Sequence, residues 1–385
     1  MPDEQFRQHV YDTFDYLHAH PELSWEEENT NRFIKEHLEK AGCKVQTFSD
    51  CTGVIADFGD VANGKPVVAV RADMDALWQE VDGKFQANHS CGHDAHMTMV
   101  LGTLWKLAKD PSIKDLVTIR FIFQPAEEVG DGALKMIEKG AVDDVDYLFG
   151  IHLRPVQEAP DGYATPAIIH GAANSIECDI IGDDAHGARP HLTSNAIDVG
   201  THIVNAINAI HLDPTVPYSV KVTKFHAGGK STNIIPGQAS LAFDLRAQTN
   251  KHMKQLTEKV YETLEATEKL FQSKIKITDD YGIPAAEVAP EAEEISRQAI
   301  SNVLGPEKTM EALITPGGDD FHFYTIKKPE LKATMIGLGC DLKPGLHHPH
   351  MTFNREALFN GIDIIAEIVQ VIAKKERASI ETRKN

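Results

Sequence analysis

The sequence predicts an α/β protein with a discontinuous larger domain, whose largely parallel sheet is flanked by helices, and an inserted β-α-β-β-α-β (ferredoxin-like) satellite domain. Three observations support this prediction. Short apolar runs of strand length alternate with helical segments, as is typical of buried parallel strands. Residues 166–281 break this alternation, and it resumes after residue 282. We therefore expect residues 1–165 and 282–385 to form the larger domain and residues 166–281 to form the satellite.

The larger domain is expected to begin with two helices within residues 5–42. Pro21 interrupts the first helical pattern, and the acidic run from Glu26 to Glu28 suits the first turn of a second helix. Strands are expected at 67–70, 117–123, 147–151 and 334–336, and further helices at 96–108, 131–139 and 355–375. The basic tail, residues 374–385, is expected to fray.

The satellite elements are inferred from a change in periodicity. Residues 175–181 alternate polar and apolar side chains, which indicates a strand with one buried face. Residues 195–210 place Ile203, Ile207 and Ile210 on one face of a helix. The remaining elements complete the β-α-β-β-α-β order, with strands at 218–225, 238–245 and 274–278 and a helix at 251–271.

The composition is that of an ordinary globular protein. The 385 residues are 42% hydrophobic and 25% charged, with a formal net charge of −19. This charge argues against nucleic acid and an anionic membrane as partners, because both are bound through Lys and Arg. The polar start without a secretory signal, the lack of a long apolar run and the five scattered cysteines lead us to expect a cytoplasmic protein.

Candidate metal ligands concentrate in the stretch Cys91-Gly92-His93. A thiolate and an imidazole separated by one glycine can point at one centre, because Gly92 lets the backbone bend tightly. The apolar spacing from Met97 to Leu107 predicts a helix that starts here, and the positive end of a helix stabilises a thiolate. Taken alone, the stretch is equally well explained by a packed thiol and a solvated imidazole.

Other candidate ligands come after predicted strands, at the sheet edge where open α/β sheets carry their sites. Together with the two residues of the glycine turn they make a set of five: Cys91, His93, Glu128, His152 and His347. Five ligands exceed the needs of one tetrahedral zinc ion. They suit two metal ions that share a bridging ligand.

Two acidic pairs accompany these ligands. Glu127 can take a proton from an attacking water and pass it to a leaving group while its neighbour Glu128 binds metal. An equally simple interpretation places both acids in the first turn of the following helix. Asp73 and Asp75 are metal ligands, residues that orient a metal-bound histidine, or turn residues, and we favour the orienting role for Asp75.

Six motifs link these residues to a known family, and they span nearly the whole chain in order. They are His20-Pro21-Glu22-Leu23, Arg71-Ala72-Asp73-Met74-Asp75-Ala76-Leu77, Ser90-Cys91-Gly92-His93-Asp94, Gln124-Pro125-Ala126-Glu127-Glu128, Gly150-Ile151-His152 and Leu346-His347-His348-Pro349. With these motifs the sequence resembles the M20 metallopeptidases. Within them it is most similar to the amidohydrolase branch, which includes aminoacylases, hippurate hydrolases and indole-acetyl-amino acid hydrolases.

The resemblance implies a role for each residue of the predicted metal site. The five ligands given above would bind two divalent metal ions, with zinc as the first choice and manganese, cobalt or nickel as alternatives. Glu127 would be the general base and acid. The last ligand would be His347 rather than His348, because the family's ligand directly follows the Leu of its Leu-His-x-Pro motif.

The resemblance also implies substrate contacts in the satellite domain, at His186, Asn233 and Arg246. In relatives the equivalent His and Asn polarise the scissile carbonyl, the His commonly coming from the partner subunit, and the equivalent Arg grips the substrate carboxylate. Without the resemblance, His186 would be interpreted as a loop histidine and Arg246 as a charge at a strand edge. Because family satellites commonly mediate dimerisation, we expect a homodimer through this domain.

These features predict a two-metal amidohydrolase that hydrolyses the amide bond of N-acyl amino acids or related small conjugates. The alternatives are a dipeptidase with the same metal site and a metal-binding regulatory protein without catalysis. Redox chemistry at Cys91 is weaker, since no second cysteine is nearby in the sequence. The chain departs from the family pattern at Trp78, at Asp184-Ala185 and at residues 317–321; these departures keep the ligands and Glu127 and bear on substrate preference.

Overall fold

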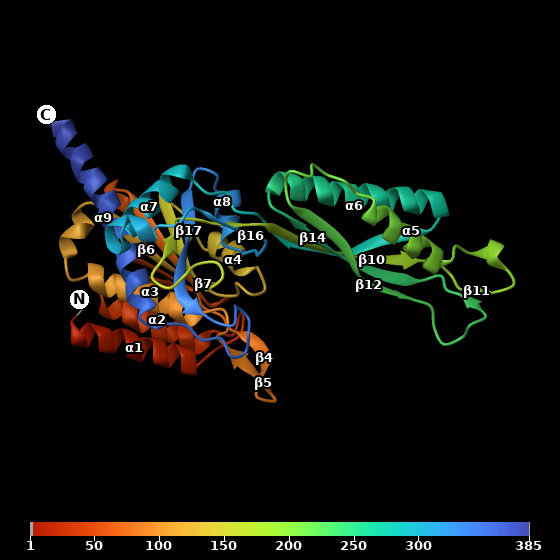
Figure 1. The fold of residues 1–385 in the computed structure, drawn as a ribbon, viewed down its shortest axis with the longest axis horizontal. Coiled ribbons are helices and arrows are strands. Elements are labelled where there is room, and N and C mark those ends of the chain that lie inside the picture. Colours follow the sequence, from red (N-terminus) through yellow and green to blue (C-terminus); the bar gives the residue numbers. More distant parts are fainter. Residues whose placement is uncertain (1–2, 385) are drawn as a thin grey trace. The chain divides into compact units, whose positions relative to one another are not determined.

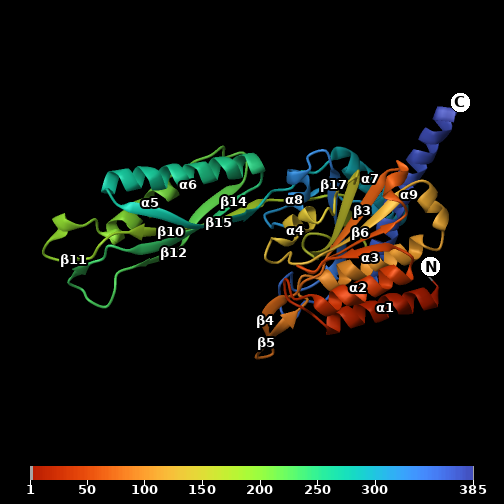
Figure 2. The same ribbon diagram turned by 180° about the vertical axis from the view of Figure 1, so that it is seen from behind.

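The computed structural model describes residues 3–384, which form two compact units (Figures 1 and 2). The first unit contains the chain up to Ile169, Glu287–Leu313 and the chain from Asp320 onward. The second contains His170–Ala286 and Ile314–Asp319.

The first unit is built on a mixed seven-stranded sheet. Its strand order is β1 (Lys44–Thr47), β2 (Val54–Phe58), β6 (Thr118–Gln124), β3 (Val67–Asp73), β7 (Tyr147–Pro155), β17 (Lys332–Leu342) and β8 (Ala164–Thr165). The four central strands, from β6 to β17, are parallel, while β1, β2 and β8 add antiparallel edges. The predicted α/β class with a largely parallel sheet is therefore confirmed.

Helices cover both faces of this sheet, which explains why its central strands are apolar on both sides. In β3, Val68 and Val70 pack into one core cluster and Ala69 into another. The first cluster lies under α1 (Glu4–Ala19), α2 (Glu28–Lys40), α3 (His93–Leu107), α7 (Pro290–Leu304) and α9 (Ala357–Lys384). The second lies under α4 (Gly132–Glu138), with Phe321 and Tyr324 at α8 (His322–Lys327).

Two local expectations for this unit are wrong. The tail expected to fray continues α9 as far as Lys384, because its Lys, Glu, Arg and Ala residues are good helix formers; Asn385 lies outside the described residues. The strand expected to end at residue 151 continues to Pro155, so His152 lies inside β7. A hairpin that was not predicted, β4 (Leu77–Val81) and β5 (Lys84–Asn88), turns at Asp82 and Gly83, which both have positive φ.

The second unit has the predicted β-α-β-β-α-β order and a four-stranded antiparallel sheet. The strand order is β12 (Tyr218–Ala227), β14 (Ala239–Ala247), β10 (Ala172–Ile181) and β15 (Lys274–Ile283). The apolar faces of α5 (Ala196–Asn208) and α6 (Asn250–Phe271) pack with these strands in one core. Two short pairs complete the strands: β11 (Ala185–His186) with β13 (Ile234–Ile235), and β9 (Ile168–His170) with β16 (Leu313–Thr315).

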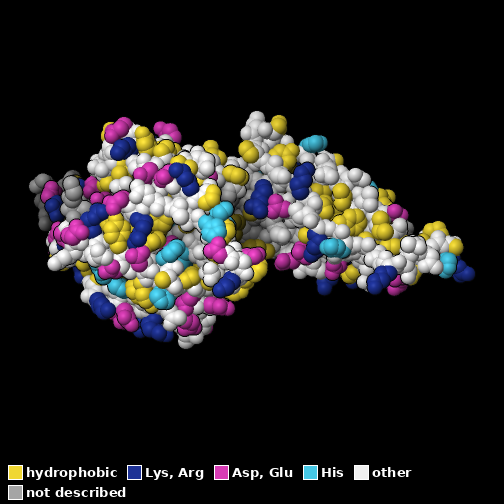
Figure 3. Space-filling view, turned by 60° about the horizontal axis from the view of Figure 1, so that its bottom comes forward, with side chains coloured by type: hydrophobic (Ala, Val, Ile, Leu, Met, Phe, Trp, Pro, Cys, Tyr) yellow, Lys and Arg dark blue, Asp and Glu magenta, His cyan; other side chains and the backbone are white. Residues whose placement is uncertain are grey.

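Acidic and basic side chains are interspersed over the face shown in Figure 3. Within residues 3–384, none of the helices combines the length and the apolar character that a bilayer crossing requires.

Candidate metal centre

The carboxyl ends of neighbouring parallel strands carry candidate site residues. Asp73, the last residue of β3, lies opposite Gln124, the last residue of β6. His152 lies in the carboxyl-terminal half of β7, opposite Gly337 of β17. Because these strands run in the same direction, the segments that follow them meet at one edge of the sheet.

Cys91 and His93 reach this edge from the start of α3. Gly92, the N-cap residue of that helix, has a φ of 89°, a left-handed conformation that favours glycine. A Cβ atom at this position would also lie 3.0 Å from Cδ1 of Leu153. The close turn leaves Cys91 and His93 buried on either side of it.

The structure brings together all five residues predicted to bind metal. Ligand atoms lie within 4.8 Å of one another in two overlapping groups, Cys91–His93–His152 and Cys91–Glu128–His347. Cys91 Sγ is 3.7 Å from His152 Nε2, and His347 Nε2 is 3.5 Å from Glu128 Oε1. Two groups that share Cys91 have the donor arrangement that a pair of metal ions needs.

Buried polar atoms at the centre of these groups lack hydrogen-bond partners. Within the described chain, His93 Nε2 and Glu128 Oε1 are buried without one, although such atoms are rarely left unpaired in folded proteins. The other nitrogen of His93 is 2.9 Å from the backbone oxygen of Asp75, and His152 Nδ1 is 2.8 Å from the backbone oxygen of Leu153. Both rings are thus fixed with Nε2 toward the centre, as metal-binding histidines usually are.

The electrostatics of the cluster also fit a cation. Burial raises the pKa of the Cys91 thiol, and the neighbouring Glu128 carboxylate raises it further. Burial likewise raises the pKa of Glu128 to about 7, with an added contribution from Asp75 and Asp73. A divalent metal ion would stabilise the thiolate and the carboxylate together, so the donor set fits a thiolate-tolerant metal such as zinc.

His96 is close to the cluster, but its ring is already used. Asp73, His93 and His96 have ligand atoms within 4.8 Å of one another. However, His96 Nδ1 is 2.7 Å from Asp73 Oδ1, and Nε2 accepts a hydrogen bond of 3.0 Å from the backbone N–H of Leu153. Neither nitrogen remains for a metal, so His96 holds Asp73 and the backbone of Leu153 in place and is not a candidate ligand.

Two other histidines of the motifs fall outside the ligand groups. His348 accepts a hydrogen bond of 3.1 Å at Nδ1 from the backbone N–H of His350 and is exposed. His89 is buried, and both its ring nitrogens lack hydrogen-bond partners among the described residues. Neither residue belongs to a group that could hold a metal within the described chain.

The Asp75 carboxylate contacts several segments of the site. Its two carboxylate oxygens accept hydrogen bonds from the backbone N–H groups of Glu127 (3.1 Å) and Glu128 (3.0 Å), and Oδ2 also accepts one of 2.6 Å from Ser24 Oγ. Oδ1 lies 3.3 Å from His93 Nδ1. Burial alone would raise the pKa of Asp75, but the contact with His93 and the hydrogen bonds from Ser24 and Glu128 together lower this pKa. This geometry fits the orienting role predicted for Asp75.

Glu127 and Glu128 lie in a turn that precedes α4. The helix begins only at Gly132, so the alternative that placed the two acids in its first turn is wrong. The residue before them, Ala126, has a φ of 52°, a left-handed conformation that costs a non-glycine residue about 1 kcal/mol or more. The turn brings ligand atoms of His93, Glu127 and Glu128 within 4.8 Å of one another.

A buried polar network that sequence reasoning missed supports Asp73. Arg71 hydrogen-bonds Asp73, donates to Gln124 Oε1 (2.9 Å) and donates to Asp320 Oδ1 (3.0 Å). Gln124 Nε2 also donates to Asp320, at 2.7 Å. A buried guanidinium with several partners locks its neighbours in place. Only the polar residues at strand ends hinted at this network, because Asp320 is 249 residues away from Arg71 in the sequence.

His347 enters the site from a loop that the β4–β5 hairpin holds. Its backbone N–H donates to the backbone oxygen of Ser90 (2.7 Å), and its own backbone oxygen accepts from Gln79 Nε2 (2.8 Å). Its φ of 64° is also left-handed. Its side chain is 53% exposed, in contrast to the buried His93 and His152, so it stands at the open side of the cluster.

In the second unit, the structure places His186 beside Asn233. His186 pairs with Ile234 in the β11–β13 ladder, and the backbone N–H of Gly187 donates to the oxygen of Asn233 (2.7 Å). His186 Nδ1 accepts a hydrogen bond of 3.1 Å from the backbone N–H of Ala188, so Nε2 carries the proton when the ring is neutral. An exposed Nε2–H is a donor for an oxygen atom.

Arg246 lies elsewhere in this unit, near the other end of β14. It donates to Asp244 on the same strand, with distances of 2.8–3.1 Å, and its side chain is 47% exposed. Ala239, the first residue of β14, is at the end of the sheet from which the chain continues to β11 (Figure 1). Seven residues separate Ala239 from Arg246, which is roughly 23 Å along a strand.

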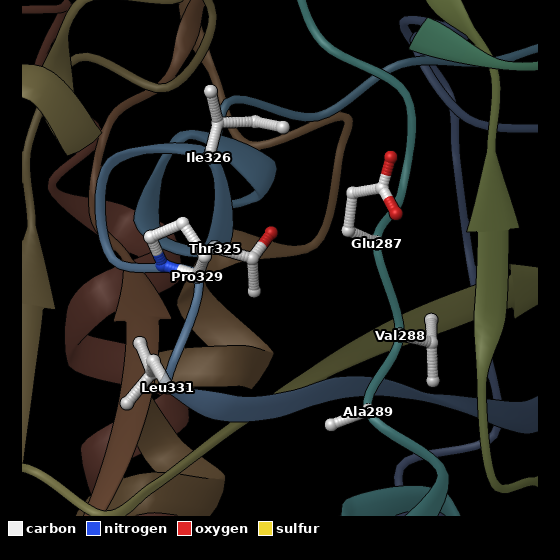
Figure 4. Close-up of a pocket in the computed structure, with 7 residues that line it drawn as sticks. All are labelled: Glu287, Val288, Ala289, Thr325, Ile326, Pro329 and Leu331. Carbon is white, nitrogen blue, oxygen red and sulfur yellow. The ribbon is translucent and has the colours of Figure 1, made fainter. Parts of the chain in front are cut away.

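A separate cavity of about 380 Å³ lies in the first unit and differs from the metal centre in its lining (Figure 4). Its lining includes a single carboxylate and neither cysteine nor histidine. The lining residues are Glu287, Val288, Ala289, Thr325, Ile326, Pro329 and Leu331. It therefore offers no set of metal ligands.

The chain is similar to known proteins over most of its length. Residues 69–371 match the model of peptidase family M20/M25/M40. Thermostable carboxypeptidase 1 of Saccharolobus solfataricus is 33% identical over 81% of this chain and 82% of its own length. N-acetyl-L-cysteine deacetylase of Bacillus subtilis is 30% identical over 89% of this chain and 83% of its own length.

A solved structure matches nearly the whole chain. The YXEP protein of Bacillus subtilis, described as a dinuclear metal-binding peptidase from the M20 family, superposes with a TM-score of 0.79. It is 26% identical, and the match covers 97% of this chain and 99% of that one. The family model spans most of the chain and includes all five clustered donors; the chain therefore belongs to peptidase family M20/M25/M40 and is a hydrolase of that family.

Proposed function

We propose that the protein is a two-metal amidohydrolase that cleaves the amide bond of N-acyl amino acids or related small amide conjugates. The observation that carries this proposal is the cluster of five donors around the unpartnered atoms His93 Nε2 and Glu128 Oε1, with a second carboxylate, Glu127, directly beside it. The description of YXEP as dinuclear supports two metal ions, and the deacetylase relative supports N-acyl amino acids as the substrate class.

Cys91, His93, Glu128, His152 and His347 would hold the metal ions. When bound, two metal ions lower the pKa of a water molecule and polarise the carbonyl of the substrate. The thiolate favours zinc, while the carboxylate and imidazoles also suit manganese, cobalt or nickel.

Glu127 is the general base and acid of this proposal. Its Oε2 atom is 3.9 Å from His93 Nε2, and its side chain is 11% exposed, so the carboxylate lies at the cluster and keeps access to the substrate side. The hydrogen bonds that Asp75 accepts from the backbone N–H groups of Glu127 and Glu128 hold the backbone of both acids in place. Glu127 takes the proton of the attacking water and delivers it to the leaving amine.

The satellite residues complete the proposal as a homodimer. His186 and Asn233 would donate to the developing oxyanion, and Arg246 would bind the substrate carboxylate in a bidentate manner. Because Arg246 lies roughly 23 Å along β14 from the end nearest to His186, one small substrate does not span both within one chain. This separation supports a homodimer in which His186 and Arg246 of one site come from different chains. All five cysteines are free thiols, which supports a reducing cytoplasm as the compartment.

A peptidase with the same site is the second candidate, because the carboxypeptidase of S. solfataricus is 33% identical to this chain. Both substrate classes present a carboxylate for Arg246. They differ at the other end, where a dipeptide carries an α-ammonium group that the site must accept and an N-acyl amino acid carries an uncharged group.

The test is a substrate comparison with protein that has been stripped by a chelator and reloaded with zinc, manganese, cobalt or nickel in separate samples. We expect N-acetyl and N-benzoyl amino acids to be hydrolysed with a kcat/KM at least tenfold above that of dipeptides with the same carboxyl-terminal residue. The stripped sample should be inactive. A preference for dipeptides would establish the second candidate, and no hydrolysis by any metal form would overturn both.

A further inference from the structure

The carboxylate of Glu27 is one that the proposed mechanism does not use. It is fully buried, at 0% exposure, on the loop between α1 and α2. Its Oε1 atom accepts a hydrogen bond of 2.9 Å from the backbone N–H of Ala126, and its Oε2 atom accepts one of 2.6 Å from Thr52 Oγ. It thus contacts the residue immediately before the Glu127–Glu128 pair, from 99 positions away in the sequence.

Glu27 does not serve its own helix. It is the N-cap residue of α2, where an acidic side chain would normally accept from the first backbone N–H groups, yet it makes no such hydrogen bond. Glu22 does this instead: its two oxygens accept from the backbone N–H groups of Asn29 (3.1 Å) and Thr30 (2.8 Å). The start of α2 is therefore satisfied without Glu27, whose carboxylate is used at Ala126.

Three consecutive backbone N–H groups at the turn donate hydrogen bonds to buried carboxylates. Ala126 donates to Glu27, whereas Glu127 and Glu128 donate to Asp75. The φ of Ala126 is 52°, so the chain is held in an unfavourable conformation at the point where the first carboxylate grips it. The direction in which Glu127 and Glu128 leave the backbone depends on this conformation.

Placing two carboxylates around one turn is itself unfavourable. The pKa of Glu27 is raised to about 7, chiefly by burial and in part by the charge of Asp75, while the hydrogen bond from Thr52 acts in the opposite direction. Burying a carboxylate in such surroundings costs free energy of folding. Its presence here therefore suggests that its hydrogen bonds serve a function. A leucine has a similar volume and carries no charge to desolvate.

We infer that Glu27 is a positioning residue for the reaction: by gripping the N–H of Ala126 it holds the left-handed turn that presents Glu127 to the substrate and Glu128 to the metal ions. This inference rests on the proposed roles of Glu127 and Glu128. It adds a second anchor to the one that Asp75 provides.

Four variants test the inference in the metal-loaded full-length protein, with N-acetyl-L-methionine or whichever N-acyl amino acid is hydrolysed fastest as the substrate. Glu27→Gln keeps an oxygen for the N–H of Ala126, Glu27→Ala removes it, and Glu27→Asp keeps the charge but is one methylene too short. Glu22→Ala is the matched control, because it removes a carboxylate from the same loop without touching Ala126.

We expect Glu27→Ala and Glu27→Asp to lower kcat about 10- to 100-fold at saturating metal, with KM changed less than threefold, and to weaken metal binding. Glu27→Gln should stay within about threefold of the parent in kcat. Glu22→Ala should lower the urea midpoint of unfolding and leave kcat unchanged.

A purely structural role for Glu27 predicts a different pattern. Glu27→Asp and Glu22→Ala would then have equal kcat at equal urea midpoints, and this result would overturn the inference; the aspartate variant serves if the alanine variant does not fold. Glu127→Gln is run beside them. If Glu127→Gln keeps full activity, the proposed function has failed, whereas an inactive Glu127→Gln beside a fully active Glu27→Asp removes the inference alone.

Discussion

The two sets of proposed functional residues differ in how the chain surrounds them. In the first unit, His93 is 0% exposed and Asp75 is 1% exposed, and both are held by residues from distant segments. In the second unit, Arg246 is 47% exposed and contacts Asp244 two residues away, and His186 is fixed by Ala188 two residues away. These residues of the first unit are thus buried and fixed by the fold, whereas those of the second unit are exposed.

From this difference we expect stability and activity to be coupled in the first unit and separable in the second. A buried group with several partners costs both when it is changed, because the partners it leaves behind remain buried. An exposed side chain with one local partner contributes little to stability. Changes to the buried supporting groups of the first unit should therefore affect metal binding and folding together, whereas changes in the second unit should affect substrate binding or rate with little change in stability.

The largest expected effect is on rate, at Glu127. Glu127→Gln keeps the size of the side chain and removes its ability to take a proton, so we expect kcat to fall about 10³-fold. The metal content, measured by elemental analysis, should stay at the parent value because Glu127 is not among the five proposed ligands. A variant with full metal content and a kcat within tenfold of the parent would contradict the general-base role.

The next effect should couple metal binding to stability, at Asp75. Asp75→Asn replaces one acceptor oxygen with an NH₂ group that faces the N–H groups of Glu127 or Glu128. We expect metal affinity to fall about 10- to 100-fold and the free energy of unfolding to fall by about 1–3 kcal/mol. Competition with a fluorescent chelator and urea unfolding of the metal-free protein measure the two quantities. Loss of one without the other would break the coupling argued for the first unit.

Arg246 should show the opposite behaviour. With Arg246→Ala, KM for an N-acyl amino acid should rise about 10- to 30-fold, since a charge-assisted hydrogen bond contributes about 1.5–3 kcal/mol. The free energy of unfolding should change by less than about 0.5 kcal/mol. The same substrate with its carboxylate converted to an amide is the control, because its KM should be equal for both proteins. An unchanged KM for the carboxylate substrate would remove the anchoring role.

The fold could be predicted from periodicity to a large extent. Central strands such as β3 and β6 are buried along their whole length and largely apolar, and each satellite helix has one apolar face, so the patterns report the covered surfaces directly. The edge strand β1 was missed, since it has the burial of an exposed strand and carries only a four-residue signal. The end of α9 was missed because charged helix formers have no tertiary pattern to read.

The clustering of the candidate ligands could be predicted because they lie near the carboxyl ends of strands or at the start of a helix, and parallel strands bring their ends together. The residues that support them could not. Glu27 contacts Ala126 across 99 residues, and Asp320 contacts Arg71 across 249 residues. One acid within the run from Glu26 to Glu28 gives the same sequence signal whether it is solvated or buried, so only the folded chain shows that Glu27 turns away from its helix.

The smallest expected effect concerns pH and extends the comparison to buried and exposed histidines away from the site. The His37 ring on α2 lies tilted against the rings of Phe33 and Trp105, with ring centroids 4.4 Å and 5.6 Å away. The pKa of His37 is lowered from 6.5 to about 4, chiefly by burial and in part by the nearby His9 and Lys40. Between these two pH values the unfolded chain binds the proton and the folded chain does not, so stability rises with pH across this window and is lost as the pH falls from 6.5 to about 4.

His37→Phe keeps an aromatic ring at this position and removes the titration. We expect its free energy of unfolding to fall less on acidification than that of the parent, by about 1 kcal/mol once the partial exposure of His37 is allowed for. Urea unfolding of metal-free protein at pH 7 and pH 5 measures the difference. His226→Phe, at an exposed position of β12, is the matched control and should keep the parent's pH dependence. Equal slopes for all three proteins would show that burial at α2 does not set the charge state of its histidine, and the contrast between buried and exposed polar groups would then hold only at the metal centre.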